Sequence, residues 1–245
     1  MRLKLIACEI IYRELCAAVA RSVNLVDVEF LPKGLHDIGQ TGMSSRLADV
    51  LASIDEPKYE AVLLGYGLCS NGLVGLAAKS IPLVVPRAHD CITLFLGSKE
   101  RYLEYFQGHP GVYFKTSGWI ERGVGLHQGE EPTQSQSALP QSYEELVARY
   151  GEDNARFLYE ELCNMRHYAG LTYIEMGIEP DDRFQRQSEA EAASRGWRYE
   201  KLSGDMRLLQ GLLDGPWDED RYLVVPPGKR IAASFDERVI KAVDS

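Results

Sequence analysis

The 245-residue chain lacks a surplus of positive charge. It has 27 Lys and Arg against 36 Asp and Glu, which gives a formal net charge of -9. A protein that binds DNA or RNA regardless of sequence needs basic side chains to displace counterions from phosphates, and an anionic membrane surface makes a similar demand. We therefore expect neither nucleic acid nor a membrane among its partners.

Long hydrophobic runs are also missing from the sequence. No stretch approaches the roughly 20 apolar residues that a membrane-spanning helix needs. The N-terminal segment begins like a signal peptide, but Glu9 and Arg13 interrupt its apolar run and no small-residue cleavage site follows. These features predict a cytoplasmic protein.

Cysteines are few, and the familiar catalytic motifs are absent. The five cysteines would stay reduced in the cytoplasm, which indicates metal binding or catalysis before disulfides. The sequence contains no CxxC pair, no HExxH helix and no GxSxG elbow. Any site must therefore be assembled by folding from segments that lie far apart in the chain.

What is present is an alternation of strand and helix patterns. Apolar and β-branched runs predict strands, and helical spacing of apolar residues predicts the segments between them. We expect strands at residues 3–10, 24–31, 59–65, 81–85 and 112–116, and helices at 12–22, 42–54, 71–79 and 92–107. Strands joined by helices of this length form a mainly parallel sheet, so the fold class is α/β and Rossmann-like.

The second half of the chain predicts a second lobe. Gly, Gln, Ser, Pro and Glu dominate residues 121–141, and a long helical stretch follows at 142–168. The tail predicts strands at 171–176, 197–202 and 222–225, with helices at 181–195 and 205–213. We therefore expect an N-terminal α/β lobe at 1–120 that carries the site, a connector at 121–168, and a smaller C-terminal α/β lobe at 169–245, with a cleft between the lobes.

Three cysteines share one position in this scheme. Cys8 closes the first strand, Cys69 follows the third and Cys91 follows the fourth. Ligands of open α/β sheets bind beyond the carboxyl ends of the strands, so these thiols are expected to meet there. Three thiolates and an imidazole from His89 would hold a tetrahedral zinc ion, and three thiolates alone could hold zinc or an iron-sulphur cluster with one open position.

The residues around these cysteines are assigned supporting roles. A turn with three glycines surrounds Cys69 and leads into the helix expected at 71–79, so Gly67 and Asn71 are expected to contact a cofactor. Asp90 is expected to cap the next helix, which places Cys91 near a positive helix end that stabilises a thiolate. Catalytic roles are assigned to His89, as ligand or acid–base group, and to Asp90, as its partner.

Two other cysteines and a simpler interpretation remain open. Cys16 lies in an apolar helical run and is expected only to pack, a role that free cysteines often have. The same packing role is open for Cys8. Cys163 and His167 are spaced to share one helix face, so Cys163 is added to the candidate metal ligands, with a packing or solvated role as the alternative.

Several sequence pieces resemble the family catalogued as domain of unknown function 1638. They include Ala7-Cys8, residues 64–72 (LGYGLCSNG), residues 87–92 (RAHDCI) with 96–98, and, in the tail, Gly196-Trp197, Gly204-Asp205 and residues 224–228 (VVPPG). The resemblance covers nearly the whole chain. It implies a bacterial or archaeal cytoplasmic protein encoded beside corrinoid-dependent methyltransferases and corrinoid proteins, and hence a role in one-carbon metabolism.

Three functions follow from these observations. The first is a metal-dependent protein of corrinoid-linked methyl metabolism that, as an enzyme, would be a transferase acting on a small molecule. The second is a non-catalytic metal-binding accessory protein that docks on a corrinoid protein or methyltransferase. The third is a metal-free thiol enzyme with Cys69 or Cys91 as nucleophile and His89 as base.

Overall fold

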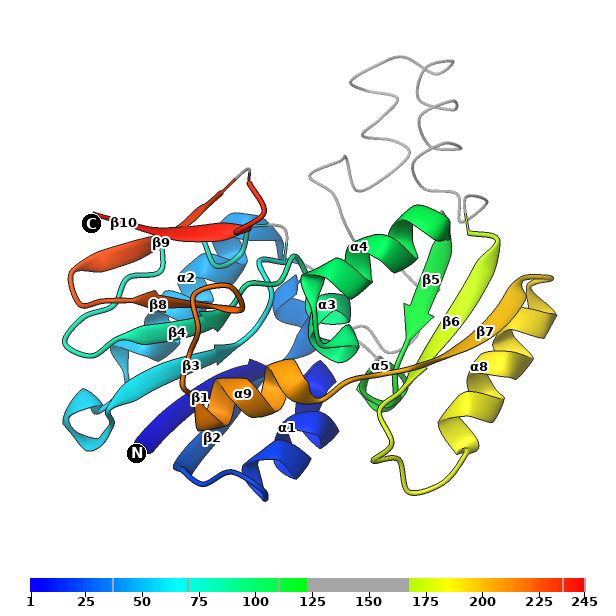
Figure 1. Ribbon diagram of the computed structural model, residues 1–245, viewed down its shortest axis with the longest axis horizontal. Helices are drawn as coiled ribbons and strands as arrows, with labels where there is room; N and C mark the ends of the chain where they lie inside the picture. The colour runs from blue at the N-terminus through cyan, green and yellow to red at the C-terminus, as the bar shows by residue number, and fades with distance from the viewer. Residues whose placement is uncertain (37, 70, 110, 123–167, 235, 245) are drawn as a thin grey trace, which may run out of the picture.

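The computed structural model describes residues 1–36, 38–69, 71–109, 111–122, 168–234 and 236–244. It is an α/β fold whose described strands form a five-stranded, a three-stranded and a two-stranded sheet (Figure 1). Nearly all of the helix expected at 142–168, with Cys163 and His167, lies outside these residues.

The five-stranded sheet has the order β2-β1-β3-β4-β8. Its first four strands, β2 (Leu25–Leu31), β1 (Arg2–Cys8), β3 (Ala61–Gly65) and β4 (Leu83–Pro86), run parallel, as predicted. β8 (Tyr222–Val225) joins the edge in the antiparallel direction, so the sheet is mixed. β3 and β4 are buried along their whole length, which explains their continuous apolar sequences.

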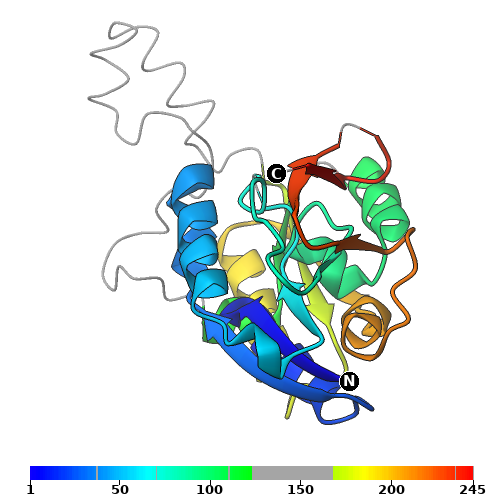
Figure 2. The same cartoon turned by 90° about the vertical axis from the view of Figure 1, so that its left-hand side faces the viewer.

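Helices cover both faces of this sheet (Figure 2). α1 (Tyr12–Val19) and α9 (Arg207–Asp214) pack on one face, and α2 (Gly39–Ala52) packs on the other. Successive residues of a strand point to opposite faces, and accordingly Leu63 belongs to the core on the α1 side while Leu64 belongs to the core under α2. The sheet is therefore the middle layer of three.

The three-stranded sheet is wholly parallel, with the order β5-β6-β7. It consists of β5 (Val112–Lys115), β6 (Gly170–Glu175) and β7 (Arg198–Ser203), and α8 (Arg183–Ser194) packs on β6 and β7. Strand pairing crosses the lobe boundaries expected from the sequence. β6 and β7 pair with β5 from the first half of the chain, whereas β8 returns to β4.

The prediction of a helix at residues 71–79 is wrong, because the described residues there form turns. Asn71 (φ 66°) and Gly75 (φ 92°) have left-handed backbone, which ends a right-handed helix. The segment pairs instead with β9 (Lys229–Ala233): the Gly75 N–H donates to the Ile231 carbonyl at 2.8 Å, and the Ile231 N–H donates to Leu76 at 2.8 Å. β9 forms an antiparallel hairpin with β10 (Ile240–Asp244), and neither strand was predicted.

The helix predicted at 92–107 is divided into α3 (Cys91–Leu96) and α4 (Lys99–Gly108). Gly97 ends α3 with a φ of 78°, and the Ser98 hydroxyl caps α4 by accepting the Arg101 N–H. A short helix that was not predicted, α5 (Ser117–Glu121), follows β5. Two 3-10 turns, η1 (Glu9–Ile11) and η2 (Lys33–His36), follow β1 and β2, and η3 (Glu56–Lys58) precedes β3.

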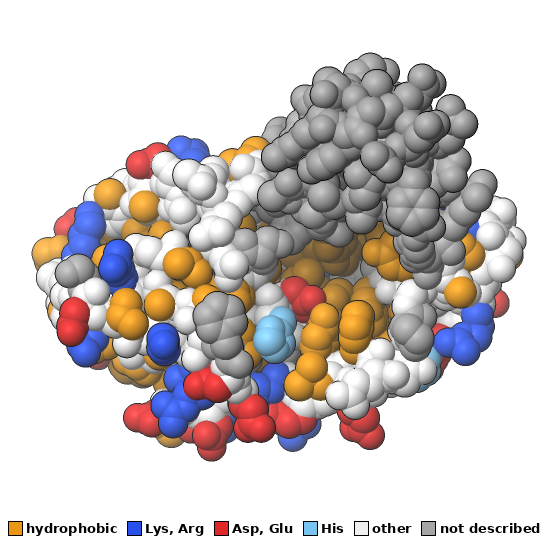
Figure 3. Space-filling model, turned by 90° about the horizontal axis from the view of Figure 1, so that it is seen from above, with side chains coloured by type: hydrophobic (Ala, Val, Ile, Leu, Met, Phe, Trp, Pro, Cys, Tyr) orange, Lys and Arg blue, Asp and Glu red, His pale blue; other side chains and the backbone are white. Residues whose placement is uncertain are grey.

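The described surface carries scattered apolar side chains. Seen from above, apolar side chains gather in a hollow near the middle of the molecule (Figure 3). Leu103 and Phe106 of α4 are among the exposed large hydrophobic residues. Within the described ranges, no helix has the length and apolarity needed to cross a membrane.

Candidate functional site

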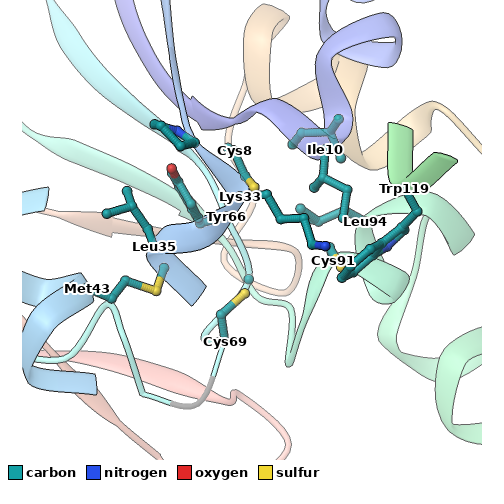
Figure 4. Close-up of a pocket in the computed structure, with 14 residues that line it drawn as sticks. Cys8, Ile10, Lys33, Leu35, Met43, Tyr66, Cys69, Cys91, Leu94 and Trp119 are labelled. Carbon is teal, nitrogen blue, oxygen red and sulfur yellow. The ribbon is translucent and has the colours of Figure 1, made fainter. Parts of the chain in front are cut away.

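A pocket lies where β1, β3 and β4 end. These strands are parallel neighbours, so their carboxyl ends open at the same edge of the sheet. The pocket is partly open to solvent, and about 470 Å³ of space that no protein atom fills lies within and at the mouth of it. Its wall is mostly apolar. Because Cys8, Cys69 and Cys91 all line it, we call it the thiol pocket (Figure 4).

Each cysteine reaches the thiol pocket from a different strand end. Cys8 is the last residue of β1, Cys69 follows β3, and Cys91 is the first residue of α3 after β4. Two backbone hydrogen bonds join the loops after β3 and β4, from Leu68 to Ala88 at 2.8 Å and from Cys69 to His89 at 3.0 Å. The two loops therefore run side by side, which brings Cys69 near Cys91.

The close approach of these loops explains Gly67, which also lines the pocket. A Cβ on Gly67 would lie 2.7 Å from the backbone of Asp90, so no side chain fits there. Cys69 has a left-handed backbone with a φ of 44°, which is rare for a residue with a side chain and costs roughly 1 kcal/mol. Backbone strain at a pocket wall is a common mark of a functional position.

The Cys69 and Cys91 thiols are poor acids. Burial raises the pKa of Cys69 to about 12 and holds the pKa of Cys91 well above its ordinary value. The negative charge of Asp90 and the neighbouring thiols raise both further, while the N–H groups of Gly67 and Cys91 donate to the Cys69 sulphur and partly offset the shift. Without a bound cation, both thiols are neutral at pH 7.

The pocket wall also carries polar groups that were not expected from the sequence. Tyr66 is 4 % exposed, and its hydroxyl has no hydrogen-bond partner in the described part of the chain. The Lys33 ammonium lies 4.4 Å from the centre of the Trp119 ring, and the buried indole N–H of Trp119 also lacks a partner among the described residues. Both Lys33 and Trp119 line the pocket.

The predicted site residues His89, Asp90 and Asn71 do not line the pocket. His89 is exposed, and its ring centre lies 6.3 Å from that of Tyr102. Asp90 caps α3, as predicted, by accepting the N–H groups of Ile92 and Thr93, and Tyr102 donates to its second oxygen at 3.1 Å. Asn71 is exposed in the turn that replaces the predicted helix, so Cys69 does not lie at a helix N-terminus.

The three cysteines line one pocket, but their side chains are not arranged as the ligands of a metal ion. Among the residues that the structure describes, no three His, Cys, Asp or Glu side chains are placed so that they could hold a metal ion. Cys16 is exposed on α1, outside the pocket and outside the core where it was expected to pack. Cys163, the other predicted ligand, lies outside the described residues.

The sequence could have indicated two of the pocket's polar residues, because each follows a predicted strand. Lys33 follows β2 and Tyr66 follows β3, so both belong to the same edge of the sheet as the cysteines. It could not have indicated Trp119, because that residue comes from α5, after a strand of the other sheet. Its place depends on how the two sheets pack.

The fold and the site together define an α/β protein with a thiol-lined pocket at the carboxyl edge of a mostly parallel sheet. The chain belongs to the family described as protein of unknown function (DUF1638), whose model matches residues 30–213. No curated protein and no solved structure matches the chain.

Replacing Tyr66 by phenylalanine is expected to leave stability unchanged or slightly raised. The hydroxyl is buried without a partner, so its removal ends a desolvation cost and breaks no protein hydrogen bond. Tyr222→Phe is the matched control, because the buried Tyr222 hydroxyl donates to the Leu208 carbonyl at 2.8 Å. That variant should lose about 1 kcal/mol in urea unfolding. An equal loss in Tyr66→Phe would contradict this account of Tyr66.

Proposed function

We propose that the thiol pocket binds a soft metal, with zinc as first choice and an iron-sulphur cluster as second, in a protein of corrinoid-linked methyl metabolism. The supporting observation is that Cys8, Cys69 and Cys91, from three separate strand ends, line one pocket. The described lining contains no Asp or Glu, so sulphur is the only anionic ligand type that it offers. Thiolates select zinc and iron-sulphur clusters over hard cations.

The residues of the pocket fit such a group in their chemistry. Thiols with raised pKa values release their protons when a metal binds, so metal affinity would rise with pH. The backbone N–H groups directed at the Cys69 sulphur would stabilise its thiolate. The thiols would have to turn toward a single ion, which a shared and partly empty pocket permits. His89 would have to turn inward to serve as fourth ligand or acid–base group.

The proposed chemistry is methyl transfer to or from a small molecule. Zinc lowers the pKa of a bound thiol and so makes it nucleophilic at neutral pH. The apolar wall would exclude water from the reacting sulphur, and Asp90 would hold α3 and therefore Cys91 in position. We further propose that the protein acts in the cytoplasm, with a corrinoid protein or a methyltransferase as partner.

The finer description of the fold belongs to the same proposal. The five-stranded sheet would form a Rossmann-like lobe and the three-stranded sheet a second lobe, with the thiol pocket opening between them. Trp119 supports this arrangement, because it reaches the pocket from the segment that follows β5 of the smaller sheet. A substrate bound there would touch both lobes.

The metal-free thiol enzyme has less support. A thiol nucleophile needs a lowered pKa or a base nearby, but burial raises the pKa of Cys69 to about 12. His89 is exposed and does not line the pocket. The non-catalytic accessory role shares the metal site, and a closed, four-ligand centre without an open position would favour it.

Metal analysis of protein purified without oxygen tests the proposal. We expect about one zinc per chain in a colourless protein, or iron and sulphide in a brown one. Cys69→Ala should lose the metal during gel filtration, since one of three thiolate ligands is gone. Cys16→Ala is the matched control and should keep it, because Cys16 lies outside the pocket. Metal-free wild-type protein that takes up neither added zinc nor, with added iron and sulphide, an iron-sulphur cluster would refute the metal site.

A further inference from the structure

The wall of the thiol pocket is rich in sulphur. Among its fourteen lining residues are three cysteines and one methionine, and none of the fourteen is His, Asp or Glu. Sulphur is a soft donor, and thiolates and thioethers favour soft ions such as Cu(I) over ions that prefer oxygen. The lining residues therefore limit the class of ion that this wall can hold.

Two of the thiols approach each other through the loops that carry them. The Cys91 N–H donates a hydrogen bond to the Cys69 sulphur, and the Cys69 N–H donates to the His89 carbonyl at 3.0 Å. The Cys91 side chain begins at the residue whose N–H already reaches the Cys69 sulphur. Rotation of the two side chains can therefore bring both sulphur atoms to one ion. Cys69 and Cys91 both line the pocket (Figure 4).

The number of available donors distinguishes between soft ions. Zinc in proteins is almost always four-coordinate. Within the described ranges, however, no three His, Cys, Asp or Glu side chains are placed so that they could hold a metal ion. Cu(I) has a filled d shell and forms stable complexes with only two thiolates, without water as a further ligand. A pair of thiols beside an apolar wall thus suits Cu(I) with less rearrangement than zinc requires.

The surroundings of the pair also stabilise the charge of such a complex. One Cu(I) ion and two thiolates carry a net charge of -1. The N–H groups of Gly67 and Cys91 are directed at the Cys69 sulphur, and N–H groups that donate to a ligating thiolate stabilise its negative charge. These donors offset the repulsion from the nearby charge of Asp90.

We propose that Cys69 and Cys91 bind one Cu(I) ion between their thiolates, more tightly than the thiol pocket binds zinc. Binding releases the two thiol protons to solvent and changes no oxidation state. The inference rests on the proposed function, since it concerns the same pocket, and adds to it an ion that competes there. It needs neither Cys8 nor an inward turn of His89.

Titration of the reduced, metal-free, full-length protein with Cu(I) under nitrogen tests the inference. The chelator bicinchoninate competes for the ion, and its coloured Cu(I) complex reports how much the protein has left. We expect one Cu(I) per chain. Cys69→Ala and Cys91→Ala should each weaken binding at least about 100-fold, because even groups that only support a metal ligand contribute 10- to 100-fold.

Cys8→Ala is the matched control, because it removes a thiol of the same pocket that the Cu(I) pair does not use. Its Cu(I) affinity should stay within about 3-fold of the wild type, well below the effect of losing a ligand. The same variant should lose zinc, which needs all three thiolates. Cys16→Ala and Cys163→Ala should also keep Cu(I).

Two further measurements do not depend on substitutions. One equivalent of Cu(I) should release the zinc from zinc-loaded wild-type protein, as a zinc-sensitive dye reports. X-ray absorption of the copper-loaded wild type should count two sulphur ligands. Circular dichroism shows whether each cysteine variant folds.

The inference would be overturned if the wild type took up no Cu(I), if zinc-loaded protein kept its zinc, or if three or more sulphur ligands were counted. Retention of Cu(I) by folded Cys69→Ala and Cys91→Ala, or its loss from folded Cys8→Ala, would do the same. The proposed function is tested separately. A protein that takes up zinc and not Cu(I) refutes this inference alone, and one that takes up Cu(I) but neither zinc nor a cluster refutes the proposed function alone.

Discussion

Gly118→Ala is expected to destabilise the protein by about 3 kcal/mol. Gly118 lies in α5, where its Cα faces the backbone of η1, and a Cβ there would overlap the carbonyl oxygen of Ile10. Backbone cannot turn aside as a flexible side chain can, so α5 would have to move away. Trp119 is the next residue of α5, and it would move with the helix away from the thiol pocket.

Chemical denaturation measures the loss. In a background with Trp197→Phe and Trp217→Phe, the fluorescence of Trp119 reports the local change. Gly108→Ala at the end of α4 is the matched control, because nothing lies within 4 Å of the added Cβ and its backbone is helical. That substitution should be neutral or stabilising by about 0.5 kcal/mol. Equal stability of Gly118→Ala and the wild type would show that α5 does not rest on η1 as described.

The second large effect is expected from Glu14→Gln, which should stabilise the protein at pH 8 and not at pH 4. Glu14 is fully buried in α1, and one of its oxygens accepts from the Ser117 hydroxyl at 3.4 Å. The other oxygen has no partner among the described residues. Burial raises the pKa of Glu14 from 4.5 to about 7, and the nearby charge of Glu179 adds to the shift.

The sign of the pH dependence follows from this raised pKa. Between pH 4.5 and 7 the folded protein holds a proton on Glu14 that the unfolded chain has released, so stability falls as the pH rises. The cost is absent below pH 4.5 and complete above pH 7. A shift of this size corresponds to about 3 kcal/mol, of which the glutamine variant should recover about 2, since its amide is still buried.

Urea unfolding of both proteins from pH 4 to pH 8 provides the measurement. The difference between the two stability curves isolates Glu14 from every other titrating group. Glu104→Gln on the exposed side of α4 is the control for the loss of a surface carboxylate. A flat difference curve for Glu14→Gln would mean that the carboxyl is hydrated or paired in solution.

The part of the site that the sequence could predict is the part that parallel strands determine. Cys8, Cys69 and Cys91 were assigned to one edge because apolar runs identify β1, β3 and β4, and parallel neighbours end at a common edge. To infer that residues at the ends of neighbouring parallel strands lie close together, no knowledge of side-chain packing is needed. The same rule applies to Lys33, because it comes just after the predicted strand that ends before Pro32, at the same edge of the sheet.

The errors occur where backbone groups find distant partners. Residues 71–79 have helical apolar spacing, yet their N–H and C=O groups pair with β9, more than 150 residues later in the chain. The tail strand at 222–225 was found correctly, but its partner was not, since an antiparallel edge strand carries no mark of which sheet it joins. Local patterns identify such segments better than they identify their neighbours.

The return of β8 to the first sheet has a practical consequence for shortening the polypeptide. A chain that stopped before Tyr222 would keep the described helices and all the parallel strands, but it would leave β4 as a bare edge. The main-chain amides of that edge would stand open beside the wholly buried residues Leu83–Pro86. Open, apolar edges recruit strands from other molecules. C-terminal truncation is therefore expected to yield aggregates instead of a smaller working protein.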